Sequence, residues 1–91
     1  MTRCVLVALD LGQAEFHESV EELALLASSA GANVQGVFTS KRRSPEAATF
    51  IGSGKVQEIF AHCQAHEVEL VVFNHSLSPA QQRNLEKALE R

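Results

Sequence analysis

The stretch Cys4-Val-Leu-Val-Ala-Leu9 is a continuous apolar run close to the start of the chain. Its length and its two valines are typical of a β-strand that is covered on both faces, as the strands of a parallel sheet are. Asp10-Leu-Gly12 interrupts the run. We therefore expect the fold to be built around this strand.

The residues that follow have the periodicity of an amphipathic helix. Apolar side chains recur at helical spacing: Phe16, Val20, Leu23, Ala24, Ala27 and Ala30. Gly31 is a residue that commonly ends a helix. In the segment 33–39 apolar and polar residues alternate weakly, which indicates a second strand. A strand, a helix and a strand in this order form a βαβ unit, so the two strands should be parallel and the crossover right-handed.

The middle of the chain is polar and basic, and more regular elements follow it. The segment 40–48 predicts a loop, with one helical turn beginning at Ser44-Pro45. We expect a very short strand at 49–51, and a helix from about Val56 whose apolar stripe contains Ile59, Phe60 and Cys63.

The last part of the chain predicts a strand at 70–73 and a final helix. Ser78, Pro79 and Gln81 have the spacing of a capping box with proline at the first helical position. The chain stops at Arg91 inside this helical pattern, without a Gly or Pro stop signal, so we expect it to be part of a longer protein. The expected fold class is α/β, a small three-layer domain with a short, mainly parallel sheet flanked by helices.

Composition restricts the class of protein. The 91 residues suffice for one domain, and 45% of them are hydrophobic, which is ordinary for a globular fold. A net charge of −3 does not indicate a free-standing nucleic-acid binder. Cys4 and Cys63 lie in apolar runs and predict buried thiols in a reduced cytosol. With no signal peptide and no apolar stretch of membrane-spanning length, we expect a cytoplasmic protein without a membrane partner.

The turn Gly52-Ser-Gly-Lys55 opens a predicted helix and could bind a phosphate. Backbone N–H groups, the positive end of the helix dipole and the lysine charge would all face such a ligand. The turn is not a Walker A loop, because Thr49 stands where that motif needs its first glycine and Val56 where it needs Ser or Thr. A tight turn without a ligand is the alternative.

Other candidates are weaker. The basic run Lys41-Arg42-Arg43 is either a solvated loop or, with Lys55, one face for an RNA backbone. Asn74-His75 follows a predicted parallel strand, where ligands gather, although a histidine that caps the next helix is the alternative. His62 and His66 are one helical turn apart, which is weak support for a metal site. No catalytic constellation is apparent, so we predict no catalytic residues and no metal site.

Two strings of sequence resemble a known family. Phe50–Val56 (FIGSGKV) and Val71–Glu86 (VVFNHSLSPAQQRNLE) are similar to the two signatures of the N-terminal domain of HflX proteins. The spacing between them matches, as does the earlier order of strand, acidic helix, Ser-Ser-Ala-Gly31 and basic loop. The resemblance covers nearly the whole chain.

The resemblance implies a function. HflX proteins are bacterial GTPases that bind the large ribosomal subunit and help to split or rescue stalled ribosomes under stress. Their N-terminal domain precedes a helical hairpin and a GTP-binding domain, and contributes to docking on ribosomal RNA. Both of those parts are missing from this sequence, so we expect residues 1–91 to be a truncated, non-enzymatic ribosome-docking domain. GTP and Mg²⁺ would belong to the missing GTPase domain.

Two other functions remain open. One is the binding of ATP or another phosphate ligand at Gly52 to Lys55, because ATP binding is ascribed to the N-terminal region of some members. The other is a regulatory surface that packs on the protein's own helical and GTPase domains, which predicts an exposed apolar patch on the final helix. The residues expected to face RNA or phosphate are Gly52, Gly54, Lys55, Asn74, His75, Gln82 and Arg83, with Lys41, Arg42 and Arg43 added on charge.

Overall fold

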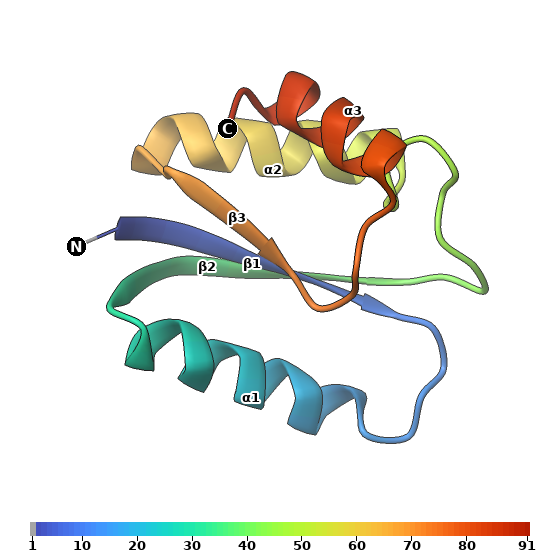
Figure 1. Cartoon of the computed structure of the whole chain (residues 1–91), viewed down its shortest axis with the longest axis horizontal. Helices are drawn as coiled ribbons and strands as arrows, with labels where there is room; N and C mark the ends of the chain where they lie inside the picture. The colour runs from blue at the N-terminus through green and yellow to red at the C-terminus, as the bar shows by residue number, and fades with distance from the viewer. Residues whose placement is uncertain (1) are drawn as a thin grey trace.

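The computed structural model describes residues 2–91. Three strands and three helices alternate along the chain (Figure 1). They are β1 (Thr2–Asp10), α1 (Phe16–Ser29), β2 (Ala32–Lys41), α2 (Ser53–His66), β3 (Leu70–Phe73) and α3 (Pro79–Leu89). The strand, helix, strand order expected for the first half of the chain is confirmed.

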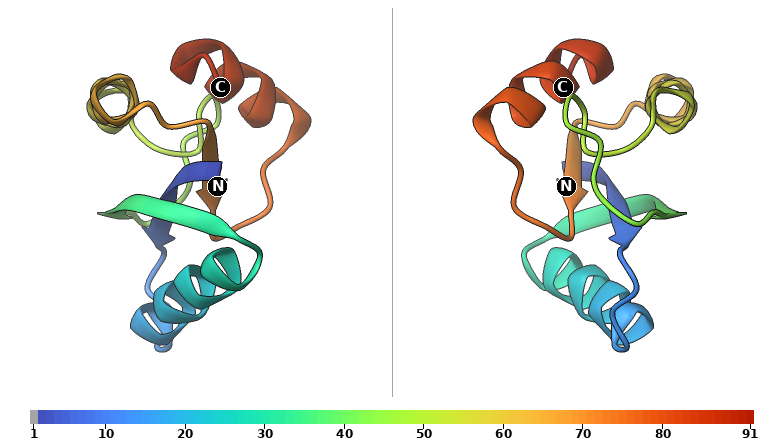
Figure 2. Two further views of the ribbon diagram at one scale, coloured as in Figure 1. Left: turned by 90° about the vertical axis from the view of Figure 1, so that its left-hand side faces the viewer. Right: turned by 90° about the vertical axis from the view of Figure 1, so that its right-hand side faces the viewer.

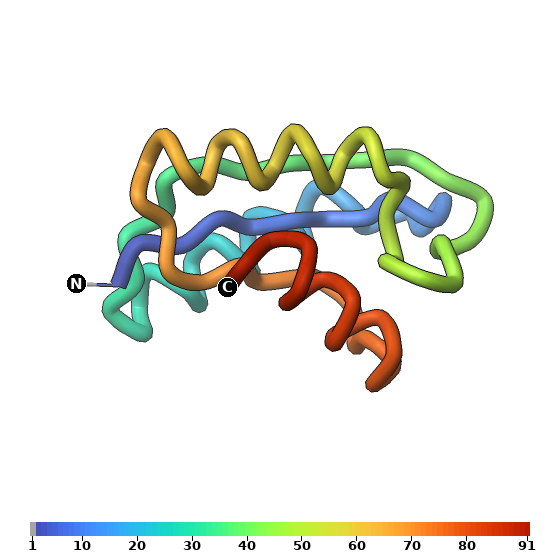
Figure 3. The backbone as a smooth tube through the Cα atoms, turned by 90° about the horizontal axis from the view of Figure 1, so that it is seen from above, coloured from blue at the N-terminus to red at the C-terminus, as the bar shows by residue number. Residues whose placement is uncertain are grey.

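The strands form one sheet in the order β2-β1-β3, and both pairings are parallel. The helix α1 lies on one face of the sheet, and α2 and α3 lie together on the other (Figures 1 and 2). Seen from above, α2 runs along β2, whereas α3 lies on the side of β3 (Figure 3). The predicted three-layer α/β fold is confirmed.

Strand β1 forms the middle of the core. All six side chains from Cys4 to Leu9 have 0% exposure. Val5, Val7 and Leu9 belong to a cluster with Ile59 of α2 and other buried residues of that layer. Because side chains alternate along a strand, the residues between them face α1. The expectation of a strand covered on both faces is correct.

Strand β2 meets α2 closely at one glycine. The pairing of β1 with β2 shifts register between Cys4 and Val5, and Gly36 is the partner of Val5 after the shift. A Cβ on Gly36 would lie 3.0 Å from Cε1 of His62. The missing side chain therefore leaves the space in which the His62 ring packs.

The segment before α2 differs from its prediction. The strand expected at 49–51 is wrong: Phe50 forms only an isolated antiparallel bridge with Glu46 and has a positive φ of 69°. The helical turn expected at Ser44-Pro45 is also absent, and residues 47–49 form a turn instead. Tertiary packing explains both differences, because the observed conformation buries Phe50 and Ile51 in the core, where they are 3% and 0% exposed.

The final helix begins as predicted and ends differently. Ser78 accepts a hydrogen bond from the Gln81 N–H and the Gln81 side chain accepts one from the Ser78 N–H, so the capping box is confirmed. The expectation that the chain stops inside the helix is wrong. The helix α3 ends at Leu89, and the backbone of Glu90 is left-handed with φ 58°. Arg91 then donates to the carbonyl oxygen of Val68.

The apolar patch expected on the final helix is not exposed. Leu85 and Leu89 of α3 are 3% and 2% exposed. The large hydrophobic side chains that do face solvent lie elsewhere: Leu25, Leu26, Val37 and Leu70. Within residues 2–91, no helix has the length and apolar character needed to cross a membrane.

We expect both cysteine thiols to be unreactive in the folded protein. Cys4 and Cys63 have 0% exposure. Burial raises the pKa of both thiols, and Arg91 offsets part of this rise at Cys63, so little of the nucleophilic thiolate forms. A chromogenic disulfide reagent should label them at the rate of global unfolding, and at once in concentrated urea. Fast labelling in native buffer would contradict the described packing.

Candidate functional site

The start of α2 presents free backbone N–H groups. Gly52 precedes the helix in an extended conformation and provides no side-chain cap. The first hydrogen bond of the helix runs from the Val56 N–H to the Gly52 carbonyl oxygen at 3.1 Å. The N–H groups of the first turn therefore lack intrahelical partners and point outward at the positive end of the helix dipole. This geometry can bind an anion.

Arg42 lies against this helix start. Its backbone N–H donates to the Asp10 carbonyl oxygen at 3.0 Å, and its Nε donates to the Ser44 carbonyl oxygen at 3.1 Å. A Cβ on Gly52 would be only 3.3 Å from Nη1 of Arg42. The structure thus places Arg42 of the basic loop beside Gly52, in line with the alternative in which the basic run and Lys55 form one face.

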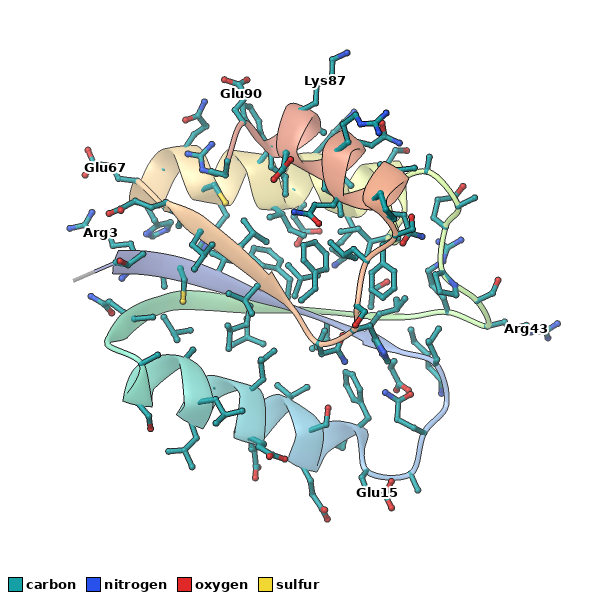
Figure 4. All side chains as sticks on the ribbon, in the orientation of Figure 1. Arg3, Glu15, Arg43, Glu67, Lys87 and Glu90 are labelled. Atoms are coloured by element: carbon teal, nitrogen blue, oxygen red, sulfur yellow. The ribbon has the colours of Figure 1, made fainter. Side chains whose placement is uncertain are left out.

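The other cations of this region differ in their surroundings. The Lys55 ammonium pairs with Glu58 at 3.3 Å, and its side chain is 27% exposed. Lys41 is the exposed last residue of β2, opposite Asp10 in the sheet register. Arg43 projects away from the molecule into solvent (Figure 4). Arg42 and Lys55 are therefore the most ordered cations at the start of α2.

Asn74 and His75 are bound to the central strand. The Asn74 side chain accepts a hydrogen bond from the Leu9 N–H at 3.0 Å and donates one to the Leu9 carbonyl oxygen at 3.4 Å. A ring nitrogen of His75 lies 3.2 Å from the same oxygen, and its ring packs beside Phe50. These side chains fasten the end of β3 to β1.

That position is the usual ligand crevice of an open parallel sheet. The connections after β1 and β3 lead to opposite faces, and ligands bind where such connections diverge. In this protein the side-chain amide of Asn74 is hydrogen-bonded to both the N–H and the carbonyl oxygen of Leu9 at that position. The arrangement gives Asn74 a structural role and leaves the start of α2 as the better candidate for a phosphate.

Gln82 and Arg83 are exposed on α3, and their neighbours make the tertiary contacts. Gln81 donates to the Glu46 carbonyl oxygen at 2.9 Å, and Asn84 donates to the Ala48 carbonyl oxygen at 2.8 Å. These bonds hold the turn before α2 against α3. This role of Asn84 is not predictable from the sequence, because its partner lies 36 residues away and no local pattern indicates it.

A hollow of about 440 Å³ runs between β3 and α3. Its walls include the four residues of β3 together with Leu77, Leu85 and Leu89, and it reaches His75 and Gln82. Arg42 and Lys55 do not line it. The hollow is mainly apolar and is separate from the basic start of α2.

The histidines of α2 form a packed pair. The rings of His62 and His66 stack with centroids 4.2 Å apart, and Phe38 meets His62 edge-on. Among residues 2–91, no three His, Cys, Asp or Glu side chains are grouped as metal ligands. Stacking and packing thus account for the spacing of these two histidines.

Comparison with known proteins gives the family. Residues 17–91 match the family described as GTP-binding GTPase N-terminal. The chain is 40% identical over 88 residues to the GTPase HflX of Escherichia coli, a match that covers 97% of the chain and 21% of the relative. It is 44% identical over 71 residues to the GTPase HflX of Alkalihalophilus pseudofirmus, which covers 78% of the chain and 17% of the relative. The chain belongs to the HflX family.

The same comparisons define which part of an HflX protein this is. The chain corresponds to the N-terminal domain and spans about a fifth of the length of these relatives. A solved structure of a variant of SsGBP has the same fold, with a TM-score of 0.71 and 22% identity. That match covers 99% of this chain and 27% of the other.

We expect Asn74→Ala to destabilise this HflX domain by about 1–3 kcal/mol, because the Leu9 N–H would lose its side-chain acceptor and the Leu9 carbonyl oxygen would keep only the His75 ring beside it. Urea unfolding followed by circular dichroism would measure the loss. Asn33→Ala, a change of the same chemistry at an exposed position of β2, should stay within about 0.5 kcal/mol of the parent. Equal effects of the two substitutions would show that the Asn74 bonds contribute little.

Proposed function

We propose that this HflX domain docks on RNA of the large ribosomal subunit in the cytoplasm, through the loop 41–43, the start of α2 and Lys55. The observation that carries the proposal is the Arg42 guanidinium held against the open N-terminus of α2. The relatives are GTPases and this chain is their N-terminal domain. GTP and Mg²⁺ would act in the remaining part of such proteins, and this domain would position it.

The chemistry of the site suits a phosphate backbone. Free N–H groups at a helix start bind phosphate oxygens, and a guanidinium adds directed donors of matching geometry. Lys55 adds a charge in the same helical turn. Because Arg42 is fixed by its backbone and Nε hydrogen bonds, little conformational freedom would be lost when RNA binds.

The uneven charge of the domain supports one orientation. The helix α1 carries Glu18, Glu21 and Glu22, all exposed, on the opposite face of the sheet from α2 (Figure 1). Phosphates would be repelled by that face and attracted by the start of α2. Local charge can steer association although the whole chain is acidic.

A second candidate uses the same residues. ATP or another phosphate ligand could bind at Gly52 to Lys55, because an N-terminal helix turn with a nearby arginine suits any phosphate. In the crevice beside Asn74, where a nucleotide would lie in many parallel-sheet proteins, the Asn74 amide is already hydrogen-bonded to the Leu9 backbone. The regulatory surface for the helical and GTPase domains is less well supported, because the apolar side chains Leu85 and Leu89 of α3 are buried.

We expect Lys55→Ala to weaken binding to purified large ribosomal subunits. Each phosphate contact releases counterions, so losing one should reduce the slope of log K against log salt by about 1. At about 0.1 M salt this corresponds to roughly five- to tenfold weaker binding. Co-sedimentation over a range of salt concentrations would measure both quantities.

Lys87→Ala is the matched control. Lys87 lies in the last turn of α3 and projects into solvent away from the start of α2 (Figure 4). Its removal changes net charge equally and should leave the affinity and the salt slope nearly unchanged. Equal effects at both lysines would indicate general charge attraction and would overturn the assigned site.

A further inference from the structure

Gln81 makes two hydrogen bonds with one side chain, and each bond serves a different element. Its Oε1 atom accepts from the Ser78 N–H at 3.0 Å and completes the cap of α3, while its Nε2 atom donates to the Glu46 carbonyl oxygen at 2.9 Å. The cap needs only an acceptor, which Glu supplies as well as Gln does. The second bond needs a donor, and an ionised carboxylate has none. The amide of Gln81 therefore joins the start of α3 to the turn before α2.

The turn 46–50 determines where α2 begins. Glu46 and Phe50 exchange both of their backbone hydrogen bonds, at 2.9 Å each. The burial of Phe50, which is 3% exposed, fixes the inner end of this turn. Because Gly52 follows closely and directly precedes α2, a shift of the turn would move the free N–H groups of the helix start.

The outer end of the turn is held from α3. Ala47 and Ala48 are exposed, so the core does not fix them. Gln81 donates to the Glu46 carbonyl oxygen and Asn84 donates to the Ala48 carbonyl oxygen. The bond from Gln81 is partly buried, whereas the bond from Asn84 is exposed. Since a hydrogen bond shielded from water is electrostatically stronger, Gln81 provides the firmer hold.

Arg42 is held by different groups. Its backbone N–H donates to the Asp10 carbonyl oxygen at the end of β1, and its Nε donates to the Ser44 carbonyl oxygen. The guanidinium and the helix start, which are the two parts of the proposed RNA site, therefore rest on separate supports. Their relative position depends on both supports.

We propose that Gln81 is a positioning residue for RNA binding, because its bond to Glu46 keeps the start of α2 beside Arg42 so that both contact the phosphate backbone. This inference rests on the proposed function. Gln81 acts on the site through the turn and not by touching the ligand. Its effect is pre-organisation, since a site already in its binding geometry loses less conformational freedom when a ligand binds.

Gln81→Glu removes the link to the turn and leaves the cap of α3 in place. The new carboxylate still accepts from the Ser78 N–H, and its charge suits the first turn of a helix. It has no proton to donate, so it would face the Glu46 carbonyl oxygen with lone pairs only. Ser78→Ala is the opposite change, because it removes the acceptor of the Gln81 N–H and leaves the Gln81 amide in place.

Ala80→Glu controls for the added negative charge. Ala80 is exposed and directly precedes Gln81 in α3. The substitution therefore adds the same charge at nearly the same place and leaves the Gln81 amide intact. Co-sedimentation with purified large ribosomal subunits measures the affinity of each variant, and the urea midpoint measures its stability.

We expect Gln81→Glu to weaken subunit binding roughly three- to tenfold, as loss of one hydrogen bond implies, with a urea midpoint close to that of the parent. Ser78→Ala should lower the urea midpoint, because a helix cap is lost, and should change the affinity less. A residue with a merely structural role would move the midpoint and the affinity together. The positioning role fails if Gln81→Glu weakens binding no more than Ala80→Glu does.

A double variant separates this inference from the proposed function. If Gln81 acts by holding the helix start beside Arg42, the losses from Gln81→Glu and Arg42→Ala overlap, and the double variant binds more tightly than the product of the single losses predicts. If Arg42→Ala weakens binding but the two losses multiply independently, the positioning role fails and the RNA site stands. If Arg42→Ala has no effect, the proposed function fails, and this inference fails with it.

Discussion

The rest of the structure depends on the complete enclosure of β1. This strand is hydrogen-bonded to β2 along one edge and to β3 along the other. Its six central side chains are fully buried between α1 on one face and the α2 and α3 layer on the other. An apolar strand in such a position excludes water from its backbone bonds, and each neighbouring element is placed by its contact with it.

The polar features at the carboxyl end of the sheet are fixed to the same strand. Asn74 and His75 bond to the backbone of Leu9, and Arg42 bonds to the carbonyl oxygen of Asp10. The turn before α2 is held separately, by Phe50 and Ile51 in the core and by hydrogen bonds from α3. Hydrogen bonds and buried side chains therefore hold the segment before α2, and the start of this helix, in one position.

The charges are arranged so that a small acidic domain can present a cationic surface. Arg42 and Lys55 stand at the helix start, their partners Glu46 and Glu58 beside them, and the acidic α1 is on the opposite face. The net charge of −3 is therefore unevenly distributed, with the cations Arg42 and Lys55 at the start of α2 and the acidic side chains of α1 on the other face of the sheet.

The sequence by itself determined the order of elements, the parallel sheet, the capping box of α3 and the family. These depend on local patterns: the apolar run 4–9, the helical spacing after it, the Ser78 to Gln81 spacing and the two family strings. The tertiary structure alone decided that residues 49–51 do not form a strand, because the positive φ of Phe50 results from burying its ring. It also brought Arg42 to Gly52, tied Asn74 to Leu9 and paired Asn84 with Ala48. Arg42 and Gly52 are ten residues apart, whereas the other two contacts join segments that are distant in the sequence. Hydrogen-bond partners at such separations are set by tertiary packing, and no periodic pattern in the sequence indicates them.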